Sequence, residues 1–275
     1  MSTESSRPPD TSEERPQPET QAQNKIELRD LRKAFERPDG SQFVVLEGVN
    51  LSVEDRAFVA IIGPSGSGKS TFLFLIAGLD SPTSGAVLVD GEEVRGPGRE
   101  RGVVFQEDAI FPWRTVLRNV EYGLELQGVP KGERLETARR YLKMVGLDKF
   151  EDLYPRQLSG GMKKRVAIAE VLANQPEVLL LDEPFGALDY VTKLSLQEEI
   201  ALIWERDQVT AVLVTHDIEE AVFLSDRVYV LRDGGLRFEV EVPFSRPRKH
   251  ELRNSREFIE LKETLWREIG HEEPT

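Results

Sequence analysis

The sequence contains no cysteine in its 275 residues, which excludes disulfide bonds, thiolate zinc sites and cysteine nucleophiles. Positive charge is also scarce, because 36 lysines and arginines face 49 aspartates and glutamates, for a formal net charge of −13. A protein that binds nucleic acid through a basic surface needs clustered cations to neutralise the phosphates. We therefore expect no nucleic-acid partner.

Long hydrophobic runs are absent as well. The best apolar stretches cover residues 58–62, 72–79 and 178–181, whereas a membrane-spanning helix needs about 20 mostly apolar residues. Residues 1–24 are rich in proline, serine, threonine and glutamate and contain no apolar signal segment. We expect them to form a disordered tail, either inert or a weak partner-binding arm. The chain is predicted to stay in the cytoplasm and not to cross a membrane alone.

The hydrophobic pattern predicts an α/β fold. Apolar and polar residues alternate from Ile26, and turn residues then lead to apolar positions in 43–53, which favours an antiparallel sheet at the N-terminus. Most of the stretch from 108 to about 174 has helical periodicity, including 131–146, so a helical insertion is expected there. Continuous apolar runs, typical of strands buried on both faces, occur at residues 58–62, 178–181 and 211–214.

A phosphate-binding loop follows the first of these buried strands. The segment matches G-x-x-x-x-G-K-[ST], between a predicted strand and a predicted helix. Glycines let successive backbone N–H groups point inward at phosphate oxygens, and the start of the following helix adds positive potential. Lys69 is expected on the β- and γ-phosphates, and the Ser70 hydroxyl on Mg²⁺. The loop comprises Gly63, Pro64, Ser65, Gly66, Ser67, Gly68, Lys69 and Ser70, with Thr71 directly after it.

A second buried strand ends in two carboxylates, Asp182 and Glu183. Successive residues of a strand point to opposite sides, so the two side chains are expected to have different tasks. Asp182 is placed to order the metal through water, and Glu183 to accept a proton from the attacking water. Acidic residues after strands are common, so this pair indicates a hydrolytic site only in combination with the phosphate loop.

Further motifs stand in a fixed order around these two. Residues 158–162 read Leu-Ser-Gly-Gly-Met before a basic helix, Gln106 follows an apolar strand, residues 186–189 follow Glu183, and His216 follows the strand 211–214. Over residues 25–242 the chain therefore resembles the ATP-binding subunit of an ABC transporter. The resemblance implies a P-loop NTPase fold: a RecA-like mixed sheet core, an N-terminal antiparallel β subdomain and a helical insertion subdomain. It also implies a head-to-tail dimer, in which each ATP lies between the Lys69 loop of one subunit and the Ser159 loop of the other.

The same resemblance assigns the site residues. It implies that His216 contacts the γ-phosphate and orients the catalytic water, and that Phe35 stacks on adenine, with Phe43 as the competing candidate. The helix that follows the Leu-Ser-Gly-Gly-Met motif is called the signature helix below. Glu170 lies on this helix, at a position where relatives commonly have arginine. The implied catalytic residues are Glu183, His216 and Gln106; Mg²⁺ is assigned to Ser70, Gln106 and Asp182; and ATP to the phosphate loop with Phe35, Thr71, Ser159, Gly160, Gly161 and Asp189.

The segment from Gln106 to Val116 is similar to the groove that receives a membrane permease in this family, although Trp113 is equally compatible with a core position. Several stretches look like the nitrate, sulfonate, taurine and bicarbonate importers. They imply a peripheral subunit on the cytoplasmic face of the membrane, working with permease subunits and indirectly with a solute-binding protein. A soluble ATPase of DNA repair or translation, or an exporter subunit, is the alternative. Residues 243–275 are expected to form a C-terminal helical extension, packed on its own domain or against a partner.

Overall fold

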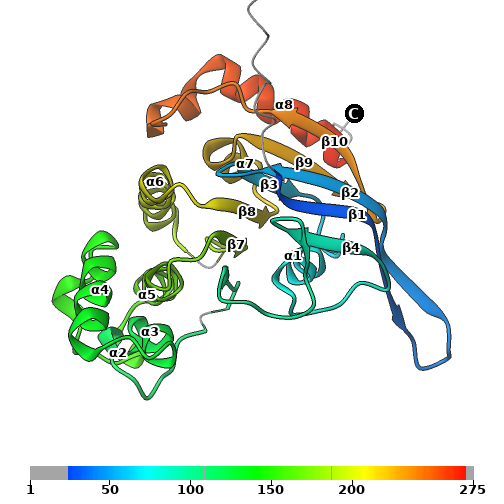
Figure 1. The fold of residues 1–275 in the computed structure, drawn as a ribbon. Coiled ribbons are helices and arrows are strands. Elements are labelled where there is room, and N and C mark those ends of the chain that lie inside the picture. Colours follow the sequence, from blue (N-terminus) through cyan, green and yellow to red (C-terminus); the bar gives the residue numbers. More distant parts are fainter. Residues whose placement is uncertain (1–23, 108, 187, 271–275) are drawn as a thin grey trace, which may run out of the picture.

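The computed structural model describes residues 24–107, 109–186 and 188–270 (Figure 1). The tail predicted over residues 1–24 lies outside the described residues except for Asn24, which begins the first strand. No helix in the described part of the chain combines the length and the apolar character that crossing a bilayer requires.

The N-terminal antiparallel sheet has the strand order β2-β1-β4-β5. It contains β1 (Asn24–Glu36), β2 (Gln42–Glu54), β4 (Ser84–Val89) and the short β5 (Glu92–Glu93). The apolar positions expected in 43–53 belong to one strand of 13 residues, because bulges shift the register between β1 and β2 without ending the pairing. The far end of this hairpin projects beyond the body of the molecule (Figure 1).

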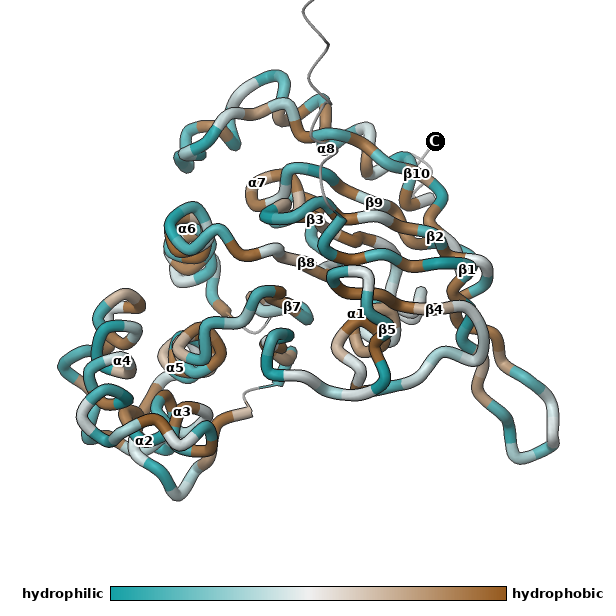
Figure 2. Tube along the Cα trace, in the orientation of Figure 1, coloured by the Kyte–Doolittle hydropathy of each residue, from teal (hydrophilic) through white to brown (hydrophobic). Residues whose placement is uncertain are grey.

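The central sheet has the strand order β10-β9-β3-β8-β7-β6. The strands from β9 to β6 are parallel, and only β10 runs antiparallel to its neighbour. Figure 2 shows hydrophobic segments along β7, β8 and β9. The strands are β3 (Phe58–Ile62), β6 (Arg101–Val104), β7 (Val178–Asp182), β8 (Thr210–Thr215), β9 (Arg227–Arg232) and β10 (Gly235–Glu241).

Two hydrophobic cores lie on the two faces of the central sheet. Alternate residues of each parallel strand serve one core or the other: Val59 and Ile61 pack with α1 (Lys69–Ala77) and the antiparallel sheet, whereas Phe58 and Ala60 pack with the later helices. This two-sided burial explains why the strands read as continuous apolar runs. It also places α1, and the loop before it, between the two sheets.

A group of helices lies at one side of the molecule (Figure 1). It includes α2 (Val116–Val120), α3 (Tyr122–Leu126), α4 (Lys131–Met144) and α5 (Gly160–Ala173), with short 3₁₀ turns at Asp148–Phe150 and Pro155–Gln157. Ala138 and Leu142 of α4 are buried, as the helical periodicity predicts. Trp113, just before α2, is 71% exposed, so it is not a core residue.

The C-terminal part adds helices to the core that contains Phe58 and Ala60. α6 (Tyr190–Asp207) and α7 (Ile218–Leu224) flank β8, and α8 (Arg256–Ile269) follows a 3₁₀ turn at His250–Asn254. Phe258, Leu265 and Ile269 of α8 are buried against the domain. Trp266 lies on the same apolar stripe but is 49% exposed, because the domain covers only part of that stripe.

Candidate nucleotide-binding and hydrolysis site

The phosphate loop joins the end of β3 to the start of α1. Gly66 (φ +79°) and Gly68 (φ +96°) adopt left-handed backbone conformations that other residues rarely adopt. A Cβ atom on Gly63 would lie 2.2 Å from the carbonyl oxygen of Leu231, so the loop packs directly against β9 at this point. The glycines at 66 and 68 are therefore required for the curvature of the loop, and the glycine at 63 is required for its close packing against β9.

The Lys69 ammonium lies inside this loop. It is 6% exposed and its Nζ donates hydrogen bonds to the carbonyls of Gly63 and Pro64, each at 3.0 Å. Burial lowers the pKa of Lys69, although the carboxylates of Glu183 and Asp182 act in the opposite direction. The buried Ser67 hydroxyl has no hydrogen-bond partner among the described residues. Curved backbone, a buried cation and an unpaired hydroxyl fit a bound phosphate chain.

Ser70 and Asp182 meet beside the loop. The Ser70 hydroxyl, in the first turn of α1, donates a 3.0 Å hydrogen bond to Asp182 Oδ1 at the end of β7. Asp182 is 3% exposed, and burial raises the pKa of its carboxyl despite that hydrogen bond. Both groups offer hard oxygen ligands of the kind Mg²⁺ prefers. The described residues contain no group of three or more His, Asp and Glu side chains able to hold a metal. The donor set thus fits a cation that is bound mainly by nucleotide phosphates and water.

Glu183, His216 and Gln106 converge next to this pair, although they follow three different strands. Glu183 Oε2 lies 3.1 Å from His216 Nδ1 and 3.4 Å from Gln106 Nε2. The backbone N–H of Glu183 donates to the Val214 carbonyl at 3.0 Å, which joins the end of β7 to the end of β8. Glu183 also has φ +41°, an unusual value for a residue with a Cβ and one that recurs at functional sites. The three residues expected to handle the catalytic water therefore share one location.

The second predicted phosphate loop lies apart from the first. Ser159 is exposed and caps α5, its Oγ accepting a hydrogen bond from the Met162 N–H at 3.3 Å. Gly160 is exposed too, so N–H groups of the first turn are accessible. Within the described residues, no hydrogen bond links this loop to residues 63–70. The Ser159 loop thus adds a second helix start with accessible N–H groups, separate from the one at the phosphate loop.

Two predicted ligand residues, Gly161 and Asp189, have clear structural roles in this chain. A Cβ atom on Gly161 would lie 2.7 Å from the Thr192 side chain, so this glycine lets the starts of α5 and α6 pack closely. Asp189 caps α6, accepting a 3.1 Å hydrogen bond from the Thr192 N–H. That hydrogen bonding lowers the pKa of the Asp189 carboxyl. Sequence analysis predicted that both residues contact ATP. It did not predict the packing contact of Gly161 or the capping hydrogen bond of Asp189, and the ATP contacts remain a prediction.

The two candidates for adenine stacking prove to be neighbours. Phe35 on β1 pairs directly with Phe43 on β2, which puts both rings on the same face of the hairpin. They are 43% and 47% exposed, and each carries a cation over its ring, Lys33 at 4.8 Å and Arg37 at 5.1 Å. Both rings are thus accessible to a flat partner.

Sequence analysis missed Lys164 on α5. It is 2% exposed, and its Nζ donates to the carbonyls of Phe105 and Gln106 at 3.1 and 2.8 Å. The ammonium therefore fixes the chain at Gln106 to the signature helix. Lys164 stands in a run of three basic residues, and nothing in such a run distinguishes a buried lysine from exposed ones.

A loop that cradles phosphates, a carboxylate and hydroxyl suited to Mg²⁺, and a glutamate at the end of the neighbouring strand together define a P-loop ATPase. The family model described as ABC transporter matches residues 46–186. The chain belongs to the ABC transporter family and is an ATP-binding ATPase of that family, as the motifs predicted. The expected cassette fold is also confirmed: a dimeric structure of a post-hydrolysis state of the ATP-binding cassette MJ0796, bound to ADP and Pi, aligns with a TM-score of 0.73 and 36% identity over 80% of this chain and 100% of that one.

Curated relatives confirm the importer subgroup to which the resemblance pointed. An uncharacterised ABC transporter ATP-binding protein of Methanocaldococcus jannaschii is 52% identical over 88% of this chain and 90% of its own length. The nitrate import ATP-binding protein NrtD of Synechocystis is 54% identical over 79% of this chain and 82% of its own length. The bicarbonate transport ATP-binding protein CmpC of Synechococcus elongatus is 46% identical over 82% of this chain, which corresponds to 34% of the longer relative.

Proposed function

We propose that this chain is the ATPase subunit of an importer for a small anion, and that it hydrolyses ATP with Mg²⁺ as a head-to-tail dimer. The observation that carries the proposal is the convergence of Glu183, His216 and Gln106 beside the Ser70–Asp182 pair. Those five residues come from four separate parts of the chain, since Asp182 and Glu183 are consecutive, and they provide the groups that phosphoryl transfer to water requires.

In this proposal each group has a distinct task. Lys69 and the loop N–H groups hold the phosphates, and Ser70 and Asp182, with Gln106, hold the metal, which neutralises charge on the phosphates when bound. Glu183 accepts the proton of the attacking water. His216 and Gln106, each within 3.4 Å of Glu183 Oε2, orient that water. Phe35 or Phe43 stacks on the adenine ring.

Two observations favour a composite site in a dimer. The Ser159 loop exposes a helix start that makes no hydrogen bond with the phosphate loop of its own chain among the described residues. The related cassette bound to ADP and Pi is itself dimeric. We therefore place the Ser159, Gly160, Gly161 and Asp189 segments of one subunit opposite the Lys69 loop of its partner.

The permease is proposed to bind near Gln106. Trp113 is 71% exposed, and its ring lies 5.4 Å from Phe111, which in turn meets Tyr122 edge-on at 4.7 Å. An exposed tryptophan supported by packed aromatic rings is a suitable receptor for an apolar partner helix. Lys164 connects Gln106, which begins the same segment, to α5, the helix that starts at the Ser159 loop. A peripheral position on the cytoplasmic face of the membrane follows from such a partner.

The anion is proposed from the relatives, two of which are named for nitrate import and bicarbonate transport. Deleting the gene in its host should abolish uptake of one of four labelled solutes: nitrate, bicarbonate, taurine or an alkanesulfonate. The wild-type gene should restore uptake, and the Glu183→Gln gene should not. Unchanged uptake of all four, together with slower repair of damaged DNA or slower translation, would favour the soluble ATPase instead. Increased retention of a solute would indicate an exporter.

A further inference from the structure

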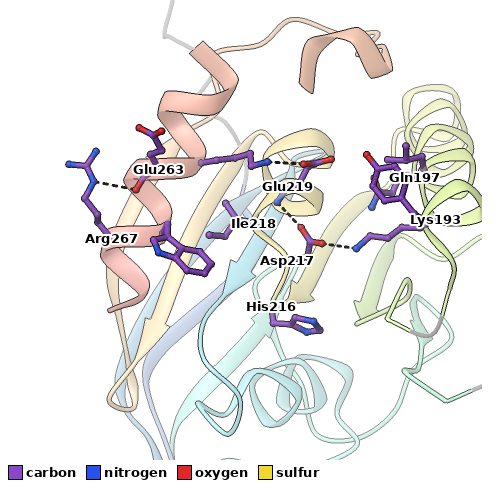
Figure 3. Close-up of a pocket in the computed structure, with 12 residues that line it drawn as sticks. Lys193, Gln197, His216, Asp217, Ile218, Glu219, Glu263 and Arg267 are labelled. Atoms are coloured by element: carbon purple, nitrogen blue, oxygen red, sulfur yellow. Dashed lines mark hydrogen bonds and ion pairs between the residues drawn. The ribbon is translucent and has the colours of Figure 1, made fainter. Parts of the chain in front are cut away.

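A groove of about 970 Å³ lies between α6, α7 and α8, and His216 is at its edge (Figure 3). Lys193, in the first turn of α6, extends across this groove toward the start of α7. The residues of the phosphate loop, 63–70, do not line the groove, so Lys193 has no direct contact with that loop through it. Its ammonium nevertheless reaches the chain segment that carries His216.

Lys193 contacts the residues on both sides of His216, one directly and one through a carboxylate. Its Nζ lies 2.6 Å from Asp217 Oδ2 and 2.6 Å from Glu220 Oε1. The other oxygen of Glu220 accepts a 2.6 Å hydrogen bond from the Thr215 hydroxyl, and the Thr215 oxygen accepts one from the Asp217 N–H at 3.0 Å. Thr215 and Asp217 are the immediate neighbours of His216. This network therefore restrains the backbone on both sides of His216.

The network is buried enough to be rigid. The side chain of Glu220 is 3% exposed and that of Lys193 is 20% exposed. Asp217 Oδ1 is also occupied, because it caps α7 by accepting hydrogen bonds from the N–H groups of Glu219 and Glu220 at 2.8 and 3.2 Å. Removing the ammonium would leave two carboxylates facing each other with no cation between them, and one of them is fully desolvated. The segment from Thr215 to Glu220 would then rearrange.

We propose that Lys193 is a positioning residue for His216. Through Lys193, the position of the first turn of α6 determines where His216 lies relative to the γ-phosphate. The inference rests on the role given to His216 in the proposed function. Thr192, the residue before Lys193, packs against Gly161 at the start of the signature helix. One helical turn thus contacts both the loop proposed to face the partner's nucleotide and the residues that flank His216.

The opposite side of α7 offers a matched control. Lys262 of α8 lies with its Nζ 2.7 Å from Glu219 Oε2, and Arg253 lies with its Nε 3.2 Å from Glu219 Oε1. Lys262→Met therefore removes an ion pair of similar length from the same helix. Glu219 is three residues from His216, and Arg253 still holds it. A general loosening of α7 would affect both lysine variants, whereas positioning of His216 would affect only Lys193.

The test is a double-mutant cycle on the ATPase activity of the full chain. Lys193→Met should lower kcat by about tenfold or more with KM for ATP within about twofold, because displacement of a catalytic group by about 1 Å has costs of this order. Lys193→Arg should recover most of kcat, and Lys262→Met should stay within about twofold of wild type. In a His216→Ala background, Lys193→Met should cause no further loss beyond about twofold, because its effect passes through His216.

A variant with both Lys193→Met and Glu220→Gln covers the case in which the single change prevents folding, since it leaves no unpaired buried carboxylate at 220. It should fold and should still lower kcat. Wild-type kcat in a folded Lys193→Met or double variant would overturn the inference, as would an equal loss in the His216→Ala background. Full activity of His216→Ala would instead overturn the role of His216 in the proposed function.

Discussion

The imidazole Nδ1 of His216 lies 3.1 Å from Oε2 of Glu183, and the two residues follow adjacent parallel strands. The carboxyl ends of parallel strands meet at one edge of a sheet, so residues 33 positions apart in sequence become neighbours. A base and an orienting group at this separation can act on the same water molecule.

Glu183→Gln should retain ATP binding and lose hydrolysis. The amide keeps the shape of the side chain but cannot accept a proton at neutral pH, so turnover should fall by about a hundredfold or more. The variant should accumulate as an ATP-bound dimer, visible by light scattering with ATP and Mg²⁺. Glu136→Gln is a suitable comparison, since it makes the same chemical change at an exposed glutamate of α4. Near wild-type turnover in Glu183→Gln would exclude Glu183 as the base.

Activity per chain should rise with protein concentration, because each complete site needs two chains. A complementation experiment tests the same point without dilution. Lys69→Ala and Ser159→Arg should each be inactive alone, and mixing them should restore up to about a quarter of the activity, since half of the dimers are mixed and each has one intact site. Two inactive variants that stay inactive when mixed, or a rate independent of concentration, would argue for a site within one chain.

Glu170→Gln should stabilise the fold above neutral pH. Burial raises the pKa of Glu170 to about 7, against an ordinary value near 4.5. Between these values the folded chain holds a proton that the unfolded chain has released, so this residue lowers the unfolding free energy as pH rises from 4.5 to 7. The penalty above pH 7 is on the order of 3 kcal/mol. Thermal unfolding should show a higher midpoint for the variant at pH 8 and no difference at pH 4.5.

A surface glutamate provides the control for that measurement. Glu136 is exposed on α4, and Glu136→Gln should leave the unfolding midpoint unchanged at both pH values. If Glu170→Gln shifts the midpoint equally at pH 4.5 and pH 8, the stabilisation does not come from the buried carboxyl.

Trp113→Ala should weaken attachment to the membrane while leaving basal ATPase activity unchanged. The side chain is 71% exposed and forms no part of the hydrolysis site, so its loss should not disturb folding. The measurement is the fraction of the chain that sediments with host membranes after a low-salt wash. Ile259→Ala, which removes a 45% exposed apolar side chain from α8, should sediment like the wild type. Equal losses of sedimentation in both variants would show that the effect is not specific to the permease-binding segment from Gln106 to Val116.

The parts of this molecule that sequence predicts well are those with short-range signals. Local sequence patterns predicted two strands correctly, from the apolar runs at 58–62 and 178–181. The glycine spacing likewise predicted the phosphate loop between β3 and α1. Resemblance then added Gln106 and His216, whose meeting with Glu183 depends on strand order and not on any local pattern.

Residues with long-range partners were beyond prediction. Lys164 and Lys193 look like ordinary helical lysines, and only the folded chain brings their ammonium groups to carbonyls or carboxylates elsewhere. Exposure was equally hard to predict: Trp113 fitted a core as well as a groove, and Trp266 shares a stripe with buried residues yet is half exposed. Burial of such side chains depends on what lies opposite them, which periodicity does not encode.

The contact between Gly161 and Thr192 has a mechanical consequence. Because no atom larger than hydrogen fits on Gly161 without displacing the Thr192 side chain, the start of α5 packs directly against the first turn of α6 at this point. Two helices in such contact lose a degree of freedom, and a displacement imposed on one is shared by the other. A displacement of the Ser159 loop would therefore also reach the turn of α6 that carries Lys193.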